Sequence, residues 1–126
     1  MIPTCDYVQR RFDEFNAQCF GGELRPIPVR LSRARSFLGQ IAYRRERRLF
    51  RRDRFADFTL RISTHFDLPE DVLDDVILHE MIHYSILSRQ IKDTSAHGKL
   101  FRSMMNDINS RFGRHITVSY RRTAAP

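Results

Sequence analysis

Apolar residues recur at helical spacing in three stretches of the chain, and the first stretch covers residues 4–20. Its apolar positions lie three or four residues apart: Val8, Phe12, Phe15 and Cys19. Thr4 or Asp6 can cap the start of this helix. Gly21-Gly22 ends it, because glycine readily adopts the left-handed conformation common at helix C-termini. The pattern predicts an amphipathic N-terminal helix.

Two further helices are predicted in the second half of the chain. Asp67 and Glu70 form a D-x-x-E variant of the capping box with Pro69 in the first turn, so a long helix is expected from there to about Gln90. The last helix covers residues 99–112 and stops at Gly113. One of its sides is apolar and contains Phe101, Met104, Met105, Ile108 and Phe112.

Between the first two helices, the pattern changes to the alternation of apolar and polar residues that is typical of strands. Strands are expected at residues 27–31, 37–43 and 58–63, a hairpin tip or loop at 44–54, and a last strand at 116–120. These elements predict an α+β fold with a small, mostly antiparallel three-stranded sheet. A single domain is expected over residues 1–126, with its core between about 4 and 120.

Composition adds a charge asymmetry to this picture. The 126 residues are 41% hydrophobic and 29% charged, which excludes wholesale disorder, and the net charge is +7. Residues 44–54 hold seven arginines and two acids, a net charge of +5, whereas residues 67–88 hold six acids and no lysine or arginine. A polyanion partner is therefore a reasonable hypothesis, and an acidic enzyme of small-molecule metabolism is a poor one.

Several protein classes are disfavoured by the same sequence. Cys5 and Cys19 would lie about 21 Å apart along one helix, too far for a disulfide bridge. The N-terminal residues do not resemble a secretory signal, and no apolar run is long enough to cross a membrane. We expect a monomer in a reducing, cytoplasmic environment, associated with the nucleoid if DNA is its partner.

The chemistry is concentrated in His79-Glu80-Met81-Ile82-His83, an H-E-x-x-H sequence within the predicted long helix. Residues four apart share a helix face, so both imidazoles can bind one zinc ion. Glu80 lies about 100° around the helix from His79, where it can reach a water on the metal. On a helical wheel both histidines fall within the apolar stripe, as a metal site that faces inward requires.

A catalytic zinc site usually has three protein ligands and an open position for water. The remaining histidines are His65, His97 and His115. His97 is favoured, because the loop after the motif helix can return it to the metal and Gly98 permits close packing there. His65 is expected in a loop or cap and His115 on the surface. The metzincin pattern fails, because Ile86 and Arg89 replace its glycine and third histidine.

The chain resembles the SprT-like zinc metallopeptidase family, whose zincin modules occur in bacteria and in eukaryotic proteases of DNA–protein crosslinks. The resemblance rests on four features of the sequence. The first is the stretch from Phe15-Asn16 to Leu24, in which Cys19 replaces an aromatic residue of the family, and the second is the predicted strand with Gly39. The third and fourth are H-E-M-x-H at residues 79–83 and H-G-x-x-F at residues 97–101. It implies a zincin-like fold, His97 as the third zinc ligand and Glu80 as the general base. Many members carry a C-terminal zinc ribbon, for which this sequence lacks cysteines, so DNA preference is expected to come from within the domain.

The resulting hypothesis is an endopeptidase with one Zn²⁺ that acts on DNA-associated or DNA-crosslinked proteins. Tyr84 and arginines of the sheet loops are candidates for stabilising the oxyanion. The arginine-rich segment is a candidate DNA-binding loop, with Phe50 able to stack on a base. The candidate DNA-binding residues are Arg44, Arg45, Arg47, Arg48, Phe50, Arg51, Arg52 and Arg54. The alternatives are a peptidase of narrow specificity without a nucleic-acid role, a non-enzymatic zinc-containing nucleic-acid-binding module, and, for the arginines alone, a solvated hairpin.

Overall fold

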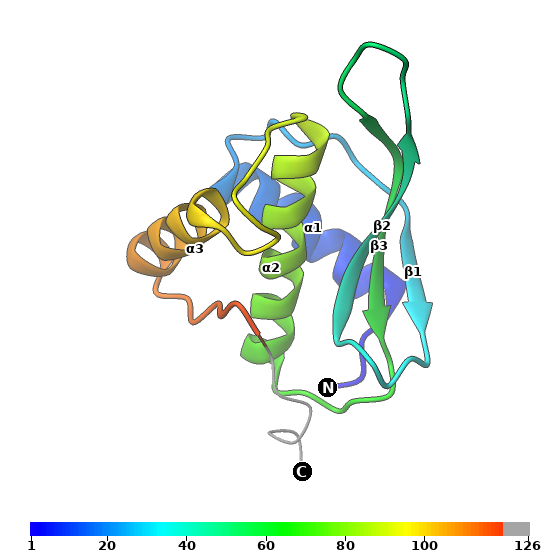
Figure 1. Ribbon diagram of the computed structural model, residues 1–126. Coiled ribbons are helices and arrows are strands. Elements are labelled where there is room, and N and C mark those ends of the chain that lie inside the picture. The colour runs from blue at the N-terminus through cyan, green and yellow to red at the C-terminus, as the bar shows by residue number, and fades with distance from the viewer. Residues whose placement is uncertain (120–126) are drawn as a thin grey trace.

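A computed structural model describes residues 1–119 and confirms the α+β fold (Figure 1). The elements follow in the order α1 (Cys5–Cys19), β1 (Val29–Ser32), β2 (Gly39–Glu46), β3 (Arg54–Ser63), α2 (Glu70–Ser88) and α3 (Lys99–Phe112). Helix α2 stands between the sheet and α3, and α1 crosses behind it (Figure 1). Within residues 1–119, no helix has the length and apolar character needed to span a membrane.

The sheet is mixed rather than mostly antiparallel, and its strand order is β1-β3-β2. β2 and β3 form an antiparallel hairpin, whereas β1 runs parallel to β3, with Val29 opposite Leu60. The chain reverses direction between β1 and β2 and again in the hairpin between β2 and β3, so β1 and β3 run in the same direction. β3 lies between the other two strands and pairs with both. As a result β2 is an edge strand.

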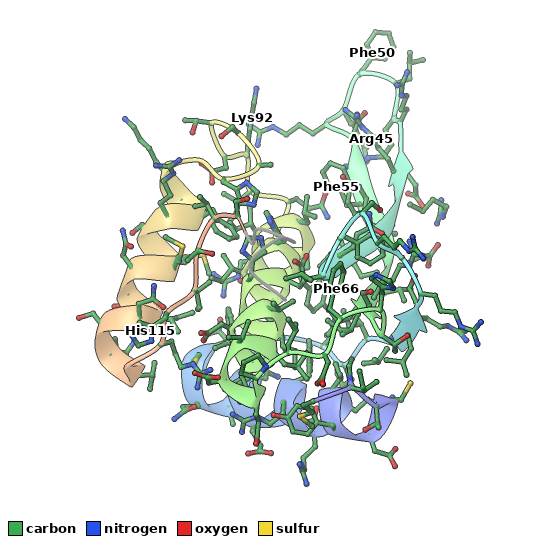
Figure 2. All side chains as sticks on the ribbon, turned by 90° about the horizontal axis from the view of Figure 1, so that it is seen from below. Arg45, Phe50, Phe55, Phe66, Lys92 and His115 are labelled. Carbon is green, nitrogen blue, oxygen red and sulfur yellow. The ribbon has the colours of Figure 1, made fainter. Side chains whose placement is uncertain are left out.

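The hairpin strands are longer than expected and extend into residues 44–54, so the tip itself comprises residues 47–53. Asp57 and Phe58 of β3 together face one residue of β2, Tyr43, and Asp57 has a φ of 56°. Such a bulge bends a hairpin and increases its twist. The tip projects beyond the helices (Figure 1), with Phe50 at its far end (Figure 2).

Two of the predicted helix ends are confirmed and one is wrong. The Thr4 hydroxyl accepts a hydrogen bond from the Tyr7 amide at 3.2 Å, and Gly113 ends α3 with a φ of 65°. The expected capping box at Asp67 does not form, because this carboxylate pairs with the amino group of Met1. Helix α2 therefore starts at Glu70 without a side-chain cap and ends at Ser88.

Helix α2 is buried on nearly every side, which makes it the centre of the core. Acidic residues at a helix start are usually solvated, but Asp74 and Asp75 are buried, each about 5–6% exposed. Asp74 pairs with Arg11 of α1 at 3.0 Å, and Asp75 pairs with Arg114 at 2.8 Å. Both carboxylates are buried because α1 and the segment after α3 cover this end of α2.

The predicted strand at residues 116–120 is not formed over residues 116–119, and Tyr120 lies outside the described residues. Asn109 of α3 makes the contacts that a neighbouring strand would supply. Its side chain accepts a hydrogen bond from the Ile116 amide at 2.8 Å and donates one to the Ile116 carbonyl at 3.0 Å. The segment is thereby held beside α2, where the Thr117 carbonyl lies 2.7 Å from Nδ1 of His79.

Candidate metal centre and active site

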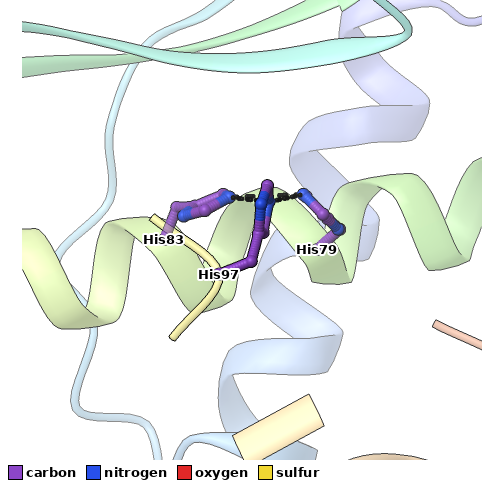
Figure 3. Close-up of side chains that lie close together, drawn as sticks. All are labelled: His79, His83 and His97. Carbon is purple, nitrogen blue, oxygen red and sulfur yellow. Dashed lines mark hydrogen bonds between the residues drawn. The ribbon is translucent and has the colours of Figure 1, made fainter. Parts of the chain in front are cut away.

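Three histidine side chains meet beside α2 (Figure 3). The Nε2 atoms of His79 and His83 are 3.2 Å apart, those of His83 and His97 3.1 Å, and those of His97 and His79 3.2 Å. His79 and His83 come from successive turns of the helix, and His97 comes from the loop that leads into α3. The structure therefore brings together the three predicted metal ligands.

All three imidazoles favour the neutral form, which is the form that binds a metal ion. Burial lowers the pKa of His79 to about 4 and that of His83 to about 3, and it also lowers the pKa of His97. The Nδ1 atom of His79 lies 2.7 Å from the Thr117 carbonyl oxygen, which can only accept. Nδ1 of His79 therefore carries the proton and its Nε2 lone pair points into the triad, as in other histidine metal sites.

The loop that carries His97 is fixed by Asp93. This carboxylate accepts hydrogen bonds from the amides of Leu100 and Phe101 in the first turn of α3, at 3.1 and 2.9 Å, and these amides hold the pKa of Asp93 below its usual range. At Gly98 a Cβ atom would lie 2.2 Å from Thr94 Oγ1 and 2.4 Å from Asp93 Oδ1. The glycine after His97 thus allows the loop to close tightly.

The ring of Phe101 packs against all three imidazoles of the triad. Its ring centroid lies 4.9 Å from that of His79, 4.6 Å from that of His83 and 4.8 Å from that of His97, and its side chain is fully buried. Contact with one rigid ring restricts the orientations of all three imidazoles. This explains why an aromatic residue stands four positions after His97.

The geometry of the triad fits a zinc ion. In a tetrahedral site with Zn–N bonds of about 2.0–2.1 Å, ligand nitrogens lie about 3.3 Å apart. The observed separations of 3.1–3.2 Å come within about 0.2 Å of this value. Three neutral imidazoles also leave one tetrahedral position open, which is the arrangement of catalytic rather than structural zinc sites.

Glu80 lies beside the triad without being part of it. Its Oε2 atom is 3.8 Å from Nε2 of His79, and only 7% of the residue is exposed. Burial raises the pKa of Glu80 to about 8, against the effect of a hydrogen bond from the Ile41 amide. A cation among the histidines would favour the ionised carboxylate. Glu80 is therefore placed to exchange a proton with a water next to the triad.

The triad and Glu80 open into a cleft of about 940 Å³ between the edge strand β2 and the end of α2. Gly39, Gln40 and Ile41 of β2 form one wall next to Glu80. The other wall consists of α2 and the loop that follows it. A cleft beside an edge strand can accept an extended peptide.

The other histidines and Tyr84 lie outside this centre. His65 and His115 are both exposed, and His65 packs against Phe66. The suggestion that Tyr84 stabilises an oxyanion is wrong, because its hydroxyl donates to the Arg25 carbonyl at 2.9 Å and its ring packs against Phe58. The arginines of the sheet loops that do line the cleft are Arg45, Arg51 and Arg52.

The candidate DNA-binding residues of the hairpin divide into two groups. Arg44 pairs with Glu46 and Asp57 at 2.7 Å, and Arg45 pairs with Asp53 at 2.6 Å. Within residues 1–119 the others form no salt bridge with an acidic side chain: Arg47, Arg48, Arg51, Arg52 and Arg54. Leu49 is 82% exposed and Phe50 97% exposed at the tip. A role for these residues in DNA binding stays a prediction.

Some functional contacts were missed by the sequence reasoning. Thr117 acts through its backbone carbonyl, which any residue would provide, so no residue type could have indicated it. Asp93 caps α3 from six residues before the helix starts, outside the usual position of a capping residue. Gly39 did carry a signal, because a glycine within a strand often marks the close approach of another element.

Comparison with known proteins agrees with this geometry. The model of the SprT-like family matches residues 8–121. The DNA-dependent metalloprotease SPRTN of Homo sapiens is 33% identical over 117 residues, which is 92% of this chain and 23% of that protein. SPRTN of Rattus norvegicus and of Bos taurus are each 32% identical over the same share of this chain, and the chain spans 22–23% of their lengths. The histidine triad and its cleft thus occur in a chain that belongs to the SprT-like family.

Proposed function

We propose that this chain is a zinc-dependent endopeptidase that cuts proteins associated with, or crosslinked to, DNA. The observation that carries the proposal is the triangle of three neutral histidine nitrogens with a buried glutamate beside it at the bottom of an open cleft. A purely structural zinc site would have no need of that glutamate.

His79, His83 and His97 would hold the zinc ion. When bound there, zinc polarises the scissile carbonyl and lowers the pKa of a water to about 7. Glu80 takes the proton of the attacking water and passes it to the leaving amine. The Ile41 amide and the close approach of Gly39 keep the Glu80 carboxylate in place while it does so.

The DNA part of the proposal has separate support. The relatives are named DNA-dependent metalloproteases. The hairpin tip of this chain presents exposed arginines without acidic partners within residues 1–119, next to an almost fully exposed aromatic ring. Phosphates can pair with the arginines, and an unpaired base can stack on Phe50. Arg51 and Arg52 also line the cleft, so a protein held on bound DNA would lie close to the catalytic centre.

Glu80→Gln is the test of the catalytic assignment. We expect the variant to bind one zinc ion like the unchanged protein, but to cut an unfolded protein at least ~100-fold more slowly, because general base catalysis contributes on the order of 10²–10⁴. Glu23→Gln, which alters a 70% exposed side chain, is the matched control and should keep full activity. Equal cleavage by Glu80→Gln would remove Glu80 from the mechanism.

The same assay with and without DNA separates the possible substrates. Cleavage that rises on addition of single-stranded DNA, and that a chelator abolishes, supports the full proposal. Zinc-dependent cleavage that DNA does not affect would indicate a peptidase of narrow specificity. DNA binding without cleavage of any protein would indicate a non-enzymatic module.

A further inference from the structure

We infer that the cleft contains a subsite for a large apolar side chain of the protein substrate, between the base of the hairpin and the C-terminal end of α2. The inference rests on the proposed peptidase function and specifies which residue it prefers near the scissile bond. One wall consists of Tyr43 and Phe55 from the sheet. The other consists of Ile86 and Leu87 of α2, together with Ile91 of the following loop.

The bulge in the hairpin creates the sheet wall. Alternate residues of a strand share a face, so in a regular β3 Phe55 would point away from the face that holds Leu60. The extra residue at Asp57–Phe58 shifts this alternation by one position and places Phe55 opposite Arg45, on the cleft side. There the ring of Phe55 meets that of Tyr43 edge to face, with centroids 5.2 Å apart.

Gln90 joins the sheet wall to the helix wall. Its side chain accepts a hydrogen bond from the Phe55 amide and donates one to the Phe55 carbonyl, both at 3.2 Å. β1 pairs with β3 only at Leu60–Ser63, so the carboxamide of Gln90 takes the place of a neighbouring strand at Phe55. Gln90 itself has a φ of 57° just after α2. The two walls are thus held at a fixed separation before any substrate binds.

Exposed apolar side chains line the subsite on both walls. Tyr43 is 46% exposed and Ile91 43% exposed, and they face the cleft from opposite walls. Clefts lined by apolar side chains with a few polar groups are typical ligand sites. Leu87 follows His83 by four residues, so this wall of the subsite begins about 6 Å along the helix axis from a metal-binding histidine. That distance suits a side chain adjacent to the bond that is cut.

The charged side chains of the cleft further restrict which substrate residue the subsite accepts. Arg51, Arg52 and Lys92 line the same cleft, whereas its acids are engaged elsewhere. Asp53 pairs with Arg45, Asp93 accepts hydrogen bonds from the first amides of α3, and Glu80 lies beside the histidines. A lysine or arginine of the substrate would therefore meet cations and an apolar surface. The subsite favours leucine, phenylalanine or methionine, and disfavours a cationic residue.

Matched peptides test this inference. They share one sequence around a mapped cleavage position and carry Leu, Phe, Ser or Lys at each neighbouring position in turn. We expect kcat/KM for Leu or Phe at one position to exceed that for Ser at least ~10-fold, the usual range for an apolar pocket. Ile91→Asp and, from the other wall, Tyr43→Ala should reduce the ratio below ~3-fold. Ile2→Asp alters an exposed isoleucine that does not line the cleft, and it should keep the ratio.

Binding provides a readout that does not need catalysis. The Glu80→Gln protein should bind the Leu or Phe peptide ~10-fold more tightly than the Ser peptide, and the added Ile91→Asp change should abolish the difference. If cleavage depends on Glu80 but proceeds equally on all peptides, the subsite is refuted and the peptidase stands. If nothing is cleaved but the binding preference remains, the peptidase is refuted and the subsite stands. If neither cleavage nor a binding preference is observed, the peptidase and the subsite are both refuted.

Discussion

The position of the Glu80 side chain depends on the residues packed around it. A Cβ atom at Gly39 would lie 2.9 Å from Val76 Cγ1 and 3.0 Å from Glu80 Cγ, closer than side-chain packing allows. The glycine in β2 thus lets the strand approach α2, and the Ile41 amide can then reach the Glu80 carboxylate. Position 39 therefore controls where Glu80, the proposed general base, lies.

Replacing Gly39 by alanine should impair catalysis without removing the metal. The added methyl group displaces Glu80, and small errors in the position of a catalytic group reduce kcat strongly, so we expect a loss of ~10-fold or more with zinc stoichiometry unchanged. Gly22→Ala is the control: its φ of 70° makes alanine strained there, but it lies outside the cleft, so stability falls and kcat does not. Full kcat in Gly39→Ala would show that Glu80 tolerates displacement.

Residue spacing alone predicted His79, Glu80 and His83, because the H-E-x-x-H spacing on a helix fixes the relative positions of these three side chains. His97 required the family resemblance in addition, since loop conformation does not follow from spacing. Tyr84 was misjudged because its position one residue after His83 gives no information about which neighbouring element takes its hydroxyl. That partner, Arg25, is 59 residues away in the chain.

The position of α2 in the core explains why Asp74 and Asp75 of this helix are buried. Helical periodicity identified the face with the histidines, but α1 and the segment after α3 cover the remaining faces through contacts distant in sequence. The same limit applies to the predicted strand at 116–120, where the side chain of Asn109 replaced a neighbouring strand. The local pattern of apolar residues predicted each helix, but contacts between residues distant in sequence determined which of its faces are buried.

Arg114→Ala should destabilise the metal-free fold in a pH-dependent way. Burial raises the pKa of Asp75, and Arg114 counteracts this rise, so the variant leaves a buried carboxylate without its partner. We expect a loss of about 2–4 kcal/mol at neutral pH. An acid whose folded pKa is raised destabilises the fold above that pKa, so the deficit should shrink as pH falls through the raised value towards the ordinary range for Asp.

Urea unfolding of both apo proteins between pH 7 and pH 4 measures this difference. Arg111→Ala serves as the control, because its partner Asp107 is 58% exposed and the pair is worth little. A deficit that stays constant with pH would mean that Arg114 contributes by packing alone.

Across the whole molecule, the positive charge of the hairpin and the metal centre share one cleft. The composition indicated a polyanion partner, and the sequence located the charge in residues 44–54. It could not indicate that Arg44 and Arg45 would be paired with acids, or that Arg51 and Arg52 would face the cleft, because both depend on the register and bulge of the hairpin. We therefore propose that the DNA contact lies mainly at the tip, residues 47–53.

The tip should account for part of the salt dependence of DNA binding. Changing Arg47 and Arg51 to glutamine should reduce the slope of log affinity against log salt by about 1.4 for single-stranded DNA, at ~0.7 per phosphate contact. The control changes Arg30 and Arg33, two exposed arginines at or after β1 on the opposite sheet edge, with the same loss of charge. Equal effects of the two pairs, measured by fluorescence anisotropy, would mean that only net charge matters.

We propose that peptide hydrolysis requires one zinc ion held by His79, His83 and His97. Titration of chelator-treated protein with Zn²⁺, while cleavage of an unfolded protein is followed, tests this proposal. We predict no cleavage without metal, a linear rise in activity, and a break at one zinc ion per chain. Cleavage by the metal-free protein, or activity that does not change as the first equivalent binds, would show that hydrolysis does not depend on this zinc ion.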